Sequence, residues 1–499
     1  MKPMSSQPDP IITAIGRAGI MGITTKQLTE VTHVPASEVS TRLGKLAAAR
    51  SISRVGRGLW VLQEHNDLSS RAEPQGQDWY ASLFEGTFGL KIGRYQGEIQ
   101  FNPNEELAVH RWWPYVQGFS AGFVENFCRR FEVGPGSVVL DPFCGSGTVP
   151  VVARLLGAKG IGIDMMPIAA FASSAKCEWD VDPADLRALS IAVTANRSRP
   201  TVQPPFLKET RKHFQPEILR ALLRLKQNIW DTEDDHAKSL AKLAFASILV
   251  DASNLKRSPC LGYVRKRGLT EETPYVLFGE AIQRMCEDLS FLHSRADTFG
   301  PKPDIIFGNA GTVPLKEESV DLAITSPPYV NGMDYVMNYK LDMAWMDMVG
   351  SYQDLKHLRA TMVACDNSPR EAITGCKPRR TTSSDEWITS VQAGIETNIK
   401  AKAAYRRNDM GAIVTKYFDD LVPVIENAYC SLRPGGRFVV VNGDSLMAGT
   451  YVPGDMIFAR LASRVGFNVN SFDIARVRRS GQRRGYLLRE SITVLQKPR

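Results

Sequence analysis

The residues with the clearest chemical capacity form the run 325–329, Thr-Ser-Pro-Pro-Tyr. The apolar and β-branched residues at 319–324 predict a strand that ends at this run. Two consecutive prolines remove backbone N–H donors and fix φ, so the chain leaves the strand as a rigid turn with free carbonyl acceptors. An amino group presented to this turn would meet the oxygens of Ser326 and Pro327 on its edge and the Tyr329 ring on its face. In isolation such a run is usually a proline turn, but it also suits chemistry on the exocyclic amine of an unstacked base.

A second motif lies upstream. Apolar residues at 138–140 lead into the run 141–148, Asp-Pro-Phe-Cys-Gly-Ser-Gly-Thr, which is followed by a helical pattern at 149–156 and a short strand at 159–163 that ends in Asp164. A strand, a glycine-rich turn, a helix and a strand ending in an acid are typical of the first half of a nucleotide-binding doubly wound sheet. Asp164 stands where a carboxylate can bind both ribose hydroxyls. The turn has neither dinucleotide spacing nor a Walker lysine, so the pattern favours a nucleoside cofactor without a phosphate chain.

Together the two motifs resemble the amino-methyltransferases, which use S-adenosyl-L-methionine (SAM) to methylate N4 of cytosine or N6 of adenine in DNA. The resemblance covers residues 105–180 and 301–499 and implies an α/β fold, a Rossmann-like SAM-dependent methyltransferase sheet. Residues 307–321 resemble the segment around the cofactor adenine, and residues 110–124 resemble the element over its methionine end. The expected cofactor-binding residues are Asp141, Pro142, Phe143, Gly145, Gly147, Thr148, Asp164, Asn309 and Tyr115.

The resemblance also assigns catalysis to Ser326, Pro327, Pro328 and Tyr329. The Ser326 hydroxyl and the Pro327 carbonyl would each accept one amine hydrogen and so direct the nitrogen lone pair toward the methyl group. Tyr329 would stack on the extruded base, with positioning and electrostatics lowering the barrier. Many adenine methylases carry Asp or Asn where Ser326 stands, so the serine favours N4 of cytosine.

Two residues after this turn are further candidates. Asp334 and Tyr335 begin a stretch that resembles the helix facing the flipped base and the cofactor in related methylases.

Other functions stay open at this point. A DNA N6-adenine methyltransferase would need only a different interpretation of Ser326. RNA guanine-N2 methyltransferases share the glycine turn and the motif order, although they usually carry Asp before the prolines. A non-catalytic DNA-binding regulator with a methylase fold is the third alternative, and the presence of both intact motifs argues against it.

Composition limits the partners. The 499 residues are 43% hydrophobic, which allows two or three domains, and the net charge of +8 is compatible with a polyanion such as double-stranded DNA. The eight cysteines form no CxxC pair, which predicts reduced thiols, no metal site and a cytoplasmic location. No apolar run has membrane-spanning length, so no membrane partner is expected. No nuclease motif is evident, so any restriction activity would need a separate restriction or defence partner.

The front of the chain predicts a separate domain. Residues 9–64 have the pattern helix, helix, turn, helix and hairpin, which is typical of a winged helix-turn-helix, with residues 65–104 as a linker and an ordered arm. Winged helices also serve as protein–protein modules. The expected DNA contacts are Arg42 and Lys45 on the recognition helix and Arg54 and Arg57 in the wing.

Three further regions carry basic residues. Residues 181–300 predict a helical insertion, a candidate target-recognition lobe with a basic stretch at 256–267, and residues 351–412 predict a basic insertion, expected as a loop that orders on DNA. The last two strands predict an antiparallel hairpin whose tip at 476–484 is suited to phosphate. The named candidates for DNA backbone contact are Arg265, Lys266, Arg478, Arg479, Arg483 and Arg484.

Overall fold

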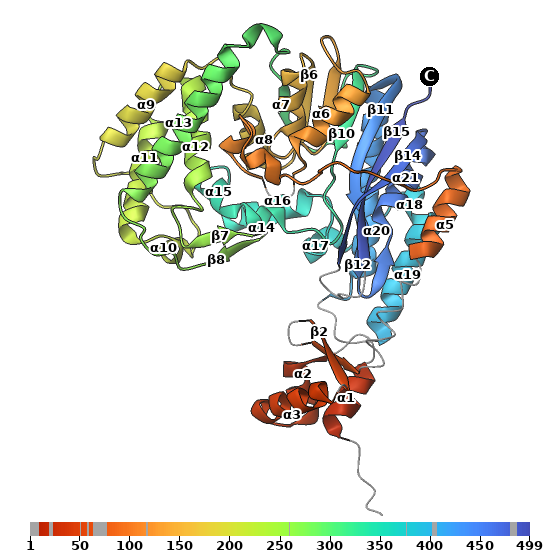
Figure 1. Cartoon of the computed structure of the whole chain (residues 1–499). Helices are drawn as coiled ribbons and strands as arrows, with labels where there is room; N and C mark the ends of the chain where they lie inside the picture. Colours follow the sequence, from red (N-terminus) through yellow and green to blue (C-terminus); the bar gives the residue numbers. More distant parts are fainter. Residues whose placement is uncertain are drawn as a thin grey trace, which may run out of the picture.

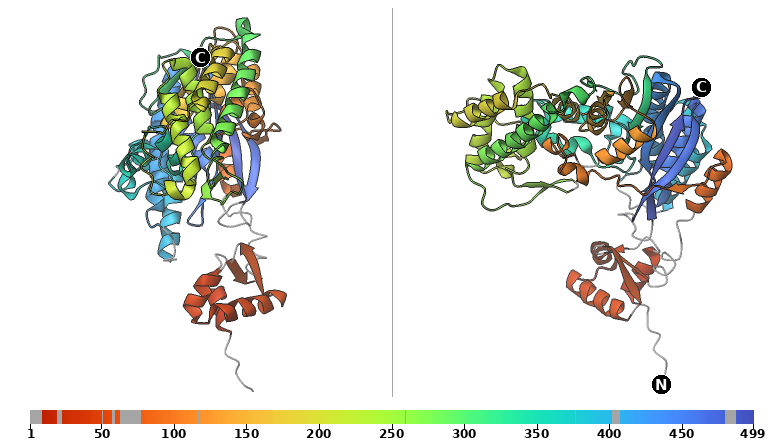
Figure 2. Two further views of the ribbon diagram at one scale, coloured as in Figure 1. Left: turned by 90° about the vertical axis from the view of Figure 1, so that its left-hand side faces the viewer. Right: turned by 45° about the horizontal axis from the view of Figure 1, so that its top comes forward.

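The computed structural model in Figure 1 describes most of the chain. The described residues are 9–18, 23–49, 51–56, 59–62, 77–115, 118–258, 260–375, 377–401, 407–479 and 487–499. The helices of residues 183–293 lie at one end of the molecule, and the last strands of the sheet lie at the other (Figures 1 and 2).

The centre is an eight-stranded sheet with the strand order β4-β14-β15-β11-β10-β5-β6-β9. The five strands β11, β10, β5, β6 and β9 run parallel to one another. Strand β15 runs antiparallel to both β11 and β14. This sheet confirms the predicted Rossmann-like methyltransferase fold with its antiparallel terminal hairpin. The strands are β4 (Gly93–Arg94), β5 (Val138–Asp141), β6 (Lys159–Asp164), β9 (Asp304–Phe307), β10 (Val320–Thr325), β11 (Leu432–Gly443), β14 (Asn468–Arg479) and β15 (Leu487–Gln496).

The central strands β5 and β10 are mostly apolar and buried because helices cover both faces of such a sheet. The helices nearest the sheet are α6 (Ala121–Arg130), α7 (Thr148–Leu155), α8 (Pro167–Ala175), α20 (Met410–Ser431) and α21 (Gly454–Val465). Parallel strands bring their carboxyl ends to one edge of the sheet, which is where ligands bind in this class of fold. The ends of β5, β6 and β10 therefore bring Asp141, Asp164 and Thr325 to the same edge.

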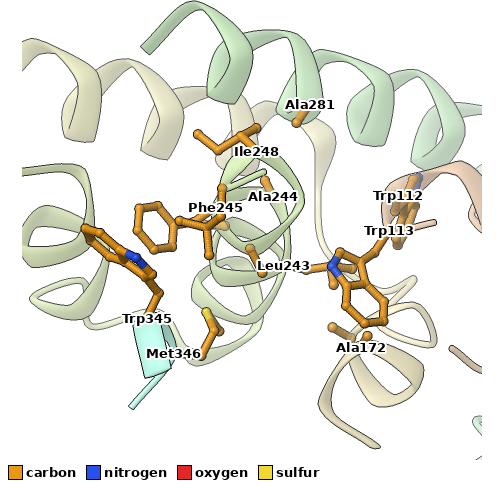
Figure 3. Close-up of a cluster of buried hydrophobic side chains, with 14 of the residues drawn as sticks. Trp112, Trp113, Ala172, Leu243, Ala244, Phe245, Ile248, Ala281, Trp345 and Met346 are labelled. Atoms are coloured by element: carbon orange, nitrogen blue, oxygen red, sulfur yellow. The ribbon is translucent and has the colours of Figure 1, made fainter. Parts of the chain in front are cut away.

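The region 181–300 is helical, and it shares one hydrophobic core with the elements around the sheet edge. Phe245 and Leu243 of α12 lie between Trp345, at the end of α15, and Trp113 (Figure 3). The insertion is therefore built onto the same core as the site. Its elements, with the helices that follow the Ser-Pro-Pro-Tyr turn, are α9 (Pro183–Ala195), α10 (Thr210–His213), α11 (Pro216–Trp230), α12 (Asp235–Ile248), β7 (Leu255–Arg257), β8 (Leu261–Tyr263), α13 (Thr273–His293), α14 (Tyr335–Asn338) and α15 (Lys340–Trp345).

The expectation of a loop at 351–412 is wrong, because most of its described residues are helical. Trp387, Ile388, Val391 and Ile395 recur at helical spacing and are buried against α20. The many Lys and Arg residues on the other faces concealed this apolar stripe. The helices are α16 (Tyr352–Thr361), α17 (Arg370–Ile373), α18 (Arg380–Ser383) and α19 (Glu386–Ala401).

The N-terminal residues form a small unit with a core of its own, in which Ile11, Leu28 and Leu43 are buried. Its elements are α1 (Pro10–Ala18), β1 (Ile23–Thr24), α2 (Thr25–Thr32), α3 (Ala36–Ala48), β2 (Ile52–Gly56) and β3 (Leu59–Leu62). Thr24 and Gln27 form a capping box at the start of α2. The interpretation of this unit as a winged helix that binds DNA stays a prediction.

In the arm that follows, the described residues begin at 77. Helix α5 (Gln77–Phe88) buries Phe84 against Phe472, with ring centroids 4.7 Å apart, and β4 adds an edge strand beside β14. Within the described residues, no helix combines the length and the apolar surface that a membrane span requires.

The terminal hairpin is held by a buried ion pair, which gives a stability prediction. The Asp455 carboxylate accepts hydrogen bonds from Arg489 Nε at 2.9 Å and Ser491 Oγ at 2.6 Å, and all three side chains are buried. Asp455→Ala would leave a buried guanidinium without this partner, so we expect a loss of about 3–5 kcal/mol in the free energy of unfolding. Urea denaturation measures it against Glu426→Ala, an exposed site on α20. Equal midpoints for the two variants would contradict the prediction.

Candidate active site

Two cavities meet at the carboxyl edge of the sheet. Cavity A, of about 540 Å³, is lined by the turn after β5, the end of β6, the loop after β9 and the helices α16 and α20. Cavity B, of about 960 Å³, is lined by residues 99–105, the β7–β8 hairpin, residues 326–335 and the inner ends of β14 and β15. Eight of the nine predicted cofactor-binding residues line cavity A: Tyr115, Asp141, Pro142, Phe143, Gly145, Thr148, Asp164 and Asn309.

The ninth residue, Gly147, does not line cavity A; it is the N-cap of α7, at the end of the glycine turn. Gly145 and Gly147 have positive φ values of +51° and +83°, which glycine adopts at least cost. A Cβ at position 147 would lie 2.4 Å from Ser173 Oγ, and one at position 145 would lie 2.9 Å from a ring carbon of Tyr115. Both glycines are therefore required by close approach as well as by backbone conformation.

Asp164 organises the turn through backbone donors. Its two carboxylate oxygens accept hydrogen bonds from the N–H groups of Gly145 and Met166, each at 2.8 Å. Burial raises the pKa of Asp164 to about 6, although these hydrogen bonds work in the opposite direction.

Asp141 links the two motifs. Its Oδ1 accepts a hydrogen bond from Thr325 Oγ1 at 2.7 Å and another from Phe143 N at 3.0 Å. Burial raises the pKa of Asp141 to about 7, and the nearby Asp164 adds to the effect. Among the described residues, neither carboxylate has a cationic side chain within ion-pair distance.

This donor set fits SAM, the expected cofactor. Two carboxylates beside cavity A suit a ligand with a sulfonium, an ammonium group and ribose hydroxyls, because a cation offsets the cost of ionising buried acids. Asp141 and Asp164 would hold its polar groups, and Phe143, Met165 and Ala310 line the same cavity with apolar surface. No group of three or more potential metal ligands occurs in the part of the chain that the structure describes.

The Ser-Pro-Pro-Tyr turn separates the two cavities. Pro328 lines cavity A, Pro327 and Tyr329 line cavity B, and Ser326 lines both. The Tyr329 hydroxyl donates a hydrogen bond to Glu490 Oε1 at 2.5 Å. Ser326 thus lies where the two cavities meet, and Tyr329 lies in the wall of cavity B.

Asp334 and Tyr335, the two further candidates after the turn, have different surroundings. Tyr335 lines both cavities. Asp334 lines neither: it accepts a hydrogen bond from Met337 N at the start of α14 and pairs with Arg359 at 2.7 Å. Its surroundings indicate a structural role.

Tyr115 belongs to an aromatic stack that the sequence did not reveal. Its ring lies 5.2 Å from that of Tyr339 with an interplanar angle of 13°, and the Arg257 guanidinium carbon lies 4.3 Å from the Tyr339 ring centroid. Arg257 also donates to Asp342 Oδ2 at 2.5 Å. Part of the basic stretch 256–267 therefore faces inward and supports the site rather than a solvated surface.

The predicted DNA contacts are spread over several elements. Arg42 pairs with Glu38 at 2.6 Å, and Lys45 and Arg54 lie in the N-terminal unit, on α3 and β2. Arg57, Arg483 and Arg484, and the side chain of Arg479, lie outside the described residues.

Arg265 and Lys266, the two candidates in the insertion, differ in their exposure and contacts. Arg265 is exposed, whereas the Lys266 ammonium donates to the carbonyl of Val250 at 2.8 Å and so stabilises the chain after α12. Arg478 lines cavity B. The DNA contacts of all these residues stay predictions.

Sequence reasoning missed Glu490 and residues 99–105. Both lie far from the turn in sequence and reach cavity B only through strand pairing and through the bridge between Gln100 and Phe119.

The sequence comparisons with known proteins point in one direction. Residues 129–171, which contain the glycine turn, match the N6/N4 methyltransferase family model, described as DNA methylase. The chain is similar to Type II methyltransferase M.BsoBI of Geobacillus stearothermophilus, with 25% identity over 463 residues that cover 83% of this chain and 89% of that protein. It is also similar to Type II methyltransferase M.AvaI of Anabaena variabilis, with 23% identity over 401 residues, 74% of this chain and 81% of that protein. A solved SAM-dependent methyltransferase of Methanosarcina mazei covers 74% of this chain and 97% of its own, with 10% identity and a TM-score of 0.26.

The glycine turn gives a prediction with a matched control. Gly147→Ala would strain a positive φ and place a methyl group against Ser173, so we expect SAM affinity to fall at least about tenfold. Gly136 has a similar φ of +86°, but a Cβ added there would meet no atom within 4 Å, so Gly136→Ala isolates the backbone strain. Isothermal titration calorimetry measures both. Equal affinities for the two variants would show that the contact with Ser173 is unimportant.

The buried carboxylates give a prediction about pH. The pKa of Asp141 is raised from 3.8 to about 7 in the fold, so this side chain is mostly protonated at pH 5.5 and mostly ionised above pH 7. A cationic ligand favours the ionised form, so SAM should bind about tenfold more weakly at pH 5.5 than at pH 7.5. Calorimetry at both pH values tests this. Asp141→Asn should remove most of the difference, and an unchanged difference in that variant would assign the effect to another group.

Proposed function

We propose that this member of the DNA amino-methyltransferase family transfers a methyl group from SAM to the N4 amine of a flipped-out cytosine in double-stranded DNA. Methyl transfer from SAM to DNA is the activity of its family. The choice of cytosine and the roles of individual residues are the further content of the proposal.

The observation that carries the proposal is the position of Ser326 where the two cavities meet. Cavity A contains the buried acids and the glycine turn, and cavity B is open to the Tyr329 ring and to the arginines of β14. A cofactor in cavity A and a base in cavity B would therefore face each other across the Ser326 hydroxyl. Such juxtaposition of two reactants supplies a large part of the rate enhancement in group transfer.

The mechanism concerns the weak nucleophilicity of the exocyclic amine, whose lone pair is delocalised into the ring. SAM, when bound, supplies an electrophilic methyl group. The Ser326 hydroxyl and the Pro327 carbonyl accept the two amine hydrogens and favour a pyramidal nitrogen. Tyr329 holds the base by stacking, and the product loses one proton to water.

Ser326 is the reason for preferring cytosine. A serine hydroxyl is a neutral acceptor that can also turn its own proton away from the amine, whereas an acid or amide at this position is common among adenine methylases. Tyr335, which lines both cavities, would help to close the space between base and cofactor.

DNA is the partner that the charge distribution supports. The net charge is +8, and Arg265 and Arg478 lie on the insertion and at cavity B respectively. We assign target recognition to the insertion and a second DNA contact to the N-terminal unit, in line with their basic residues. A separate restriction or defence partner and a cytoplasmic location complete the proposal.

The test is modified-base mass spectrometry on DNA from cells expressing the chain. We expect N4-methylcytosine with the parent and a loss of at least about 100-fold with Ser326→Ala, because one of two acceptors at the reacting nitrogen is removed. Ser319→Ala is the control, since this half-buried serine lines neither cavity and its hydroxyl donates to the nearby carbonyl of Lys316.

Other outcomes are informative. N6-methyladenine in place of N4-methylcytosine would overturn the choice of base and leave the mechanism in place. Absence of both bases, with SAM still bound, would move the search to RNA or to a missing specificity partner.

A further inference from the structure

The Ser-Pro-Pro-Tyr turn is held at both of its ends. At the start, Thr325 Oγ1 donates to the buried Asp141 carboxylate at 2.7 Å. At the end, the Tyr329 hydroxyl donates to Glu490 Oε1 at 2.5 Å. Two prolines lie between these points, and their fixed φ angles make the turn rigid, so that the position of one end constrains that of the other.

Glu490 is itself fixed by its neighbours in the sheet. It lies on β15, opposite Gly443 of β11 on one side and Arg476 of β14 on the other. Its second oxygen, Oε2, lies 3.1 Å from Arg476 Nε, and its side chain is 13% exposed. The carboxylate therefore bridges a guanidinium and a phenol at the wall of cavity B, and its charge is offset there.

The Tyr329 ring has little freedom beyond this hydrogen bond. A Cβ on Gly443 would lie 3.3 Å from ring carbon Cε2 of Tyr329, so the ring rests against the backbone of β11. Burial and the neighbouring Glu490 raise the pKa of Tyr329 above its ordinary value, so the phenol keeps its proton and remains the donor.

We propose that Glu490 is a positioning residue for methyl transfer, which acts by holding the Tyr329 hydroxyl and thereby sets the Tyr329 ring and the acceptors of the Ser-Pro-Pro turn. This inference rests on the proposed function. It assigns a role to the tyrosine hydroxyl, which stacking alone does not require, and to a carboxylate 161 residues away.

The geometry leads to specific expectations for three variants. Glu490→Ala and Tyr329→Phe each remove the hydrogen bond, so each should lower kcat about tenfold or more while the KM for SAM stays within about twofold of wild type. Glu490→Gln keeps an acceptor oxygen for the phenol and should recover most of the activity that Glu490→Ala loses. Because both residues act through one bond, Tyr329→Phe combined with Glu490→Ala should be no slower than the slower single variant.

The experiment measures transfer of a tritiated methyl group from SAM to unmethylated phage DNA, with purified full-length chain. Glu426→Ala, at an exposed carboxylate on α20, is the control for loss of a negative charge. Melting temperatures and SAM binding are recorded for every variant, and if Glu490→Ala does not fold, Tyr329→Phe and Glu490→Gln carry the comparison.

The outcomes separate this inference from the proposed function. Wild-type kcat in Glu490→Ala or Tyr329→Phe, or losses that multiply in the double variant, would overturn the role of Glu490 and leave DNA methylation intact. A wild-type chain that binds SAM but transfers no methyl group to DNA would overturn the proposed function, and the inference with it.

Discussion

One buried hydrogen bond, from Thr325 Oγ1 to the Asp141 carboxylate, joins the two motifs that make the site. The partners are 184 residues apart in sequence but stand at the carboxyl ends of adjacent parallel strands, β5 and β10. The bond fixes the end of the glycine turn relative to the start of the Ser-Pro-Pro-Tyr turn. A hydroxyl and a carboxylate buried without each other would each carry a desolvation cost. The segment inserted between β5 and β10, including the helices of residues 183–293, therefore has to return the chain so that Thr325 lies beside Asp141.

Asp141 also belongs to a pair of buried acids beside cavity A that is costly for the fold. Asp141 and Asp164 are both buried, and burial raises the pKa of each side chain. Burial of two neighbouring acids carries a desolvation cost, so stability alone does not favour this arrangement. A cationic ligand such as SAM would offset this cost, because it favours the ionised form of both acids. Perturbed acids of this kind concentrate at functional sites.

The sequence was sufficient to predict those parts of the fold and site that depend on contiguous residues. The glycine turn, the acid that ends β6 and the proline turn are contiguous patterns whose backbone constraints can be read directly, and the helical insertion follows from its periodicity. The helices of residues 351–412 were missed because Lys and Arg dominate the composition while the four apolar positions of α19 form only a narrow stripe. Glu490, and the inward position of Arg257 within the basic stretch 256–267, were not predicted for another reason. Their roles depend on the register of β15 against β11 and β14, and on the folding of β7 back toward Tyr339, and neither relation leaves a trace in the residues nearby.

The two cavities also differ in which segments of the sequence form their walls, and this difference bears on specificity. Cavity A takes about half of its wall from the turns at the ends of β5, β6, β9 and β10, which short motifs specify, and the rest mainly from residues 115, 118 and 119 and from helices α16 and α20. Cavity B takes its wall from residues 99–105, from the β7–β8 hairpin, from residues 326–335 and from β14 with β15. Under the proposed function, a base in cavity B would contact four distant segments, and three of them lie outside the Ser-Pro-Pro-Tyr turn. Under the proposed function, the Ser-Pro-Pro-Tyr turn acts on the amine, whereas the fit of the base depends on packing between the arm, the insertion and the terminal hairpin.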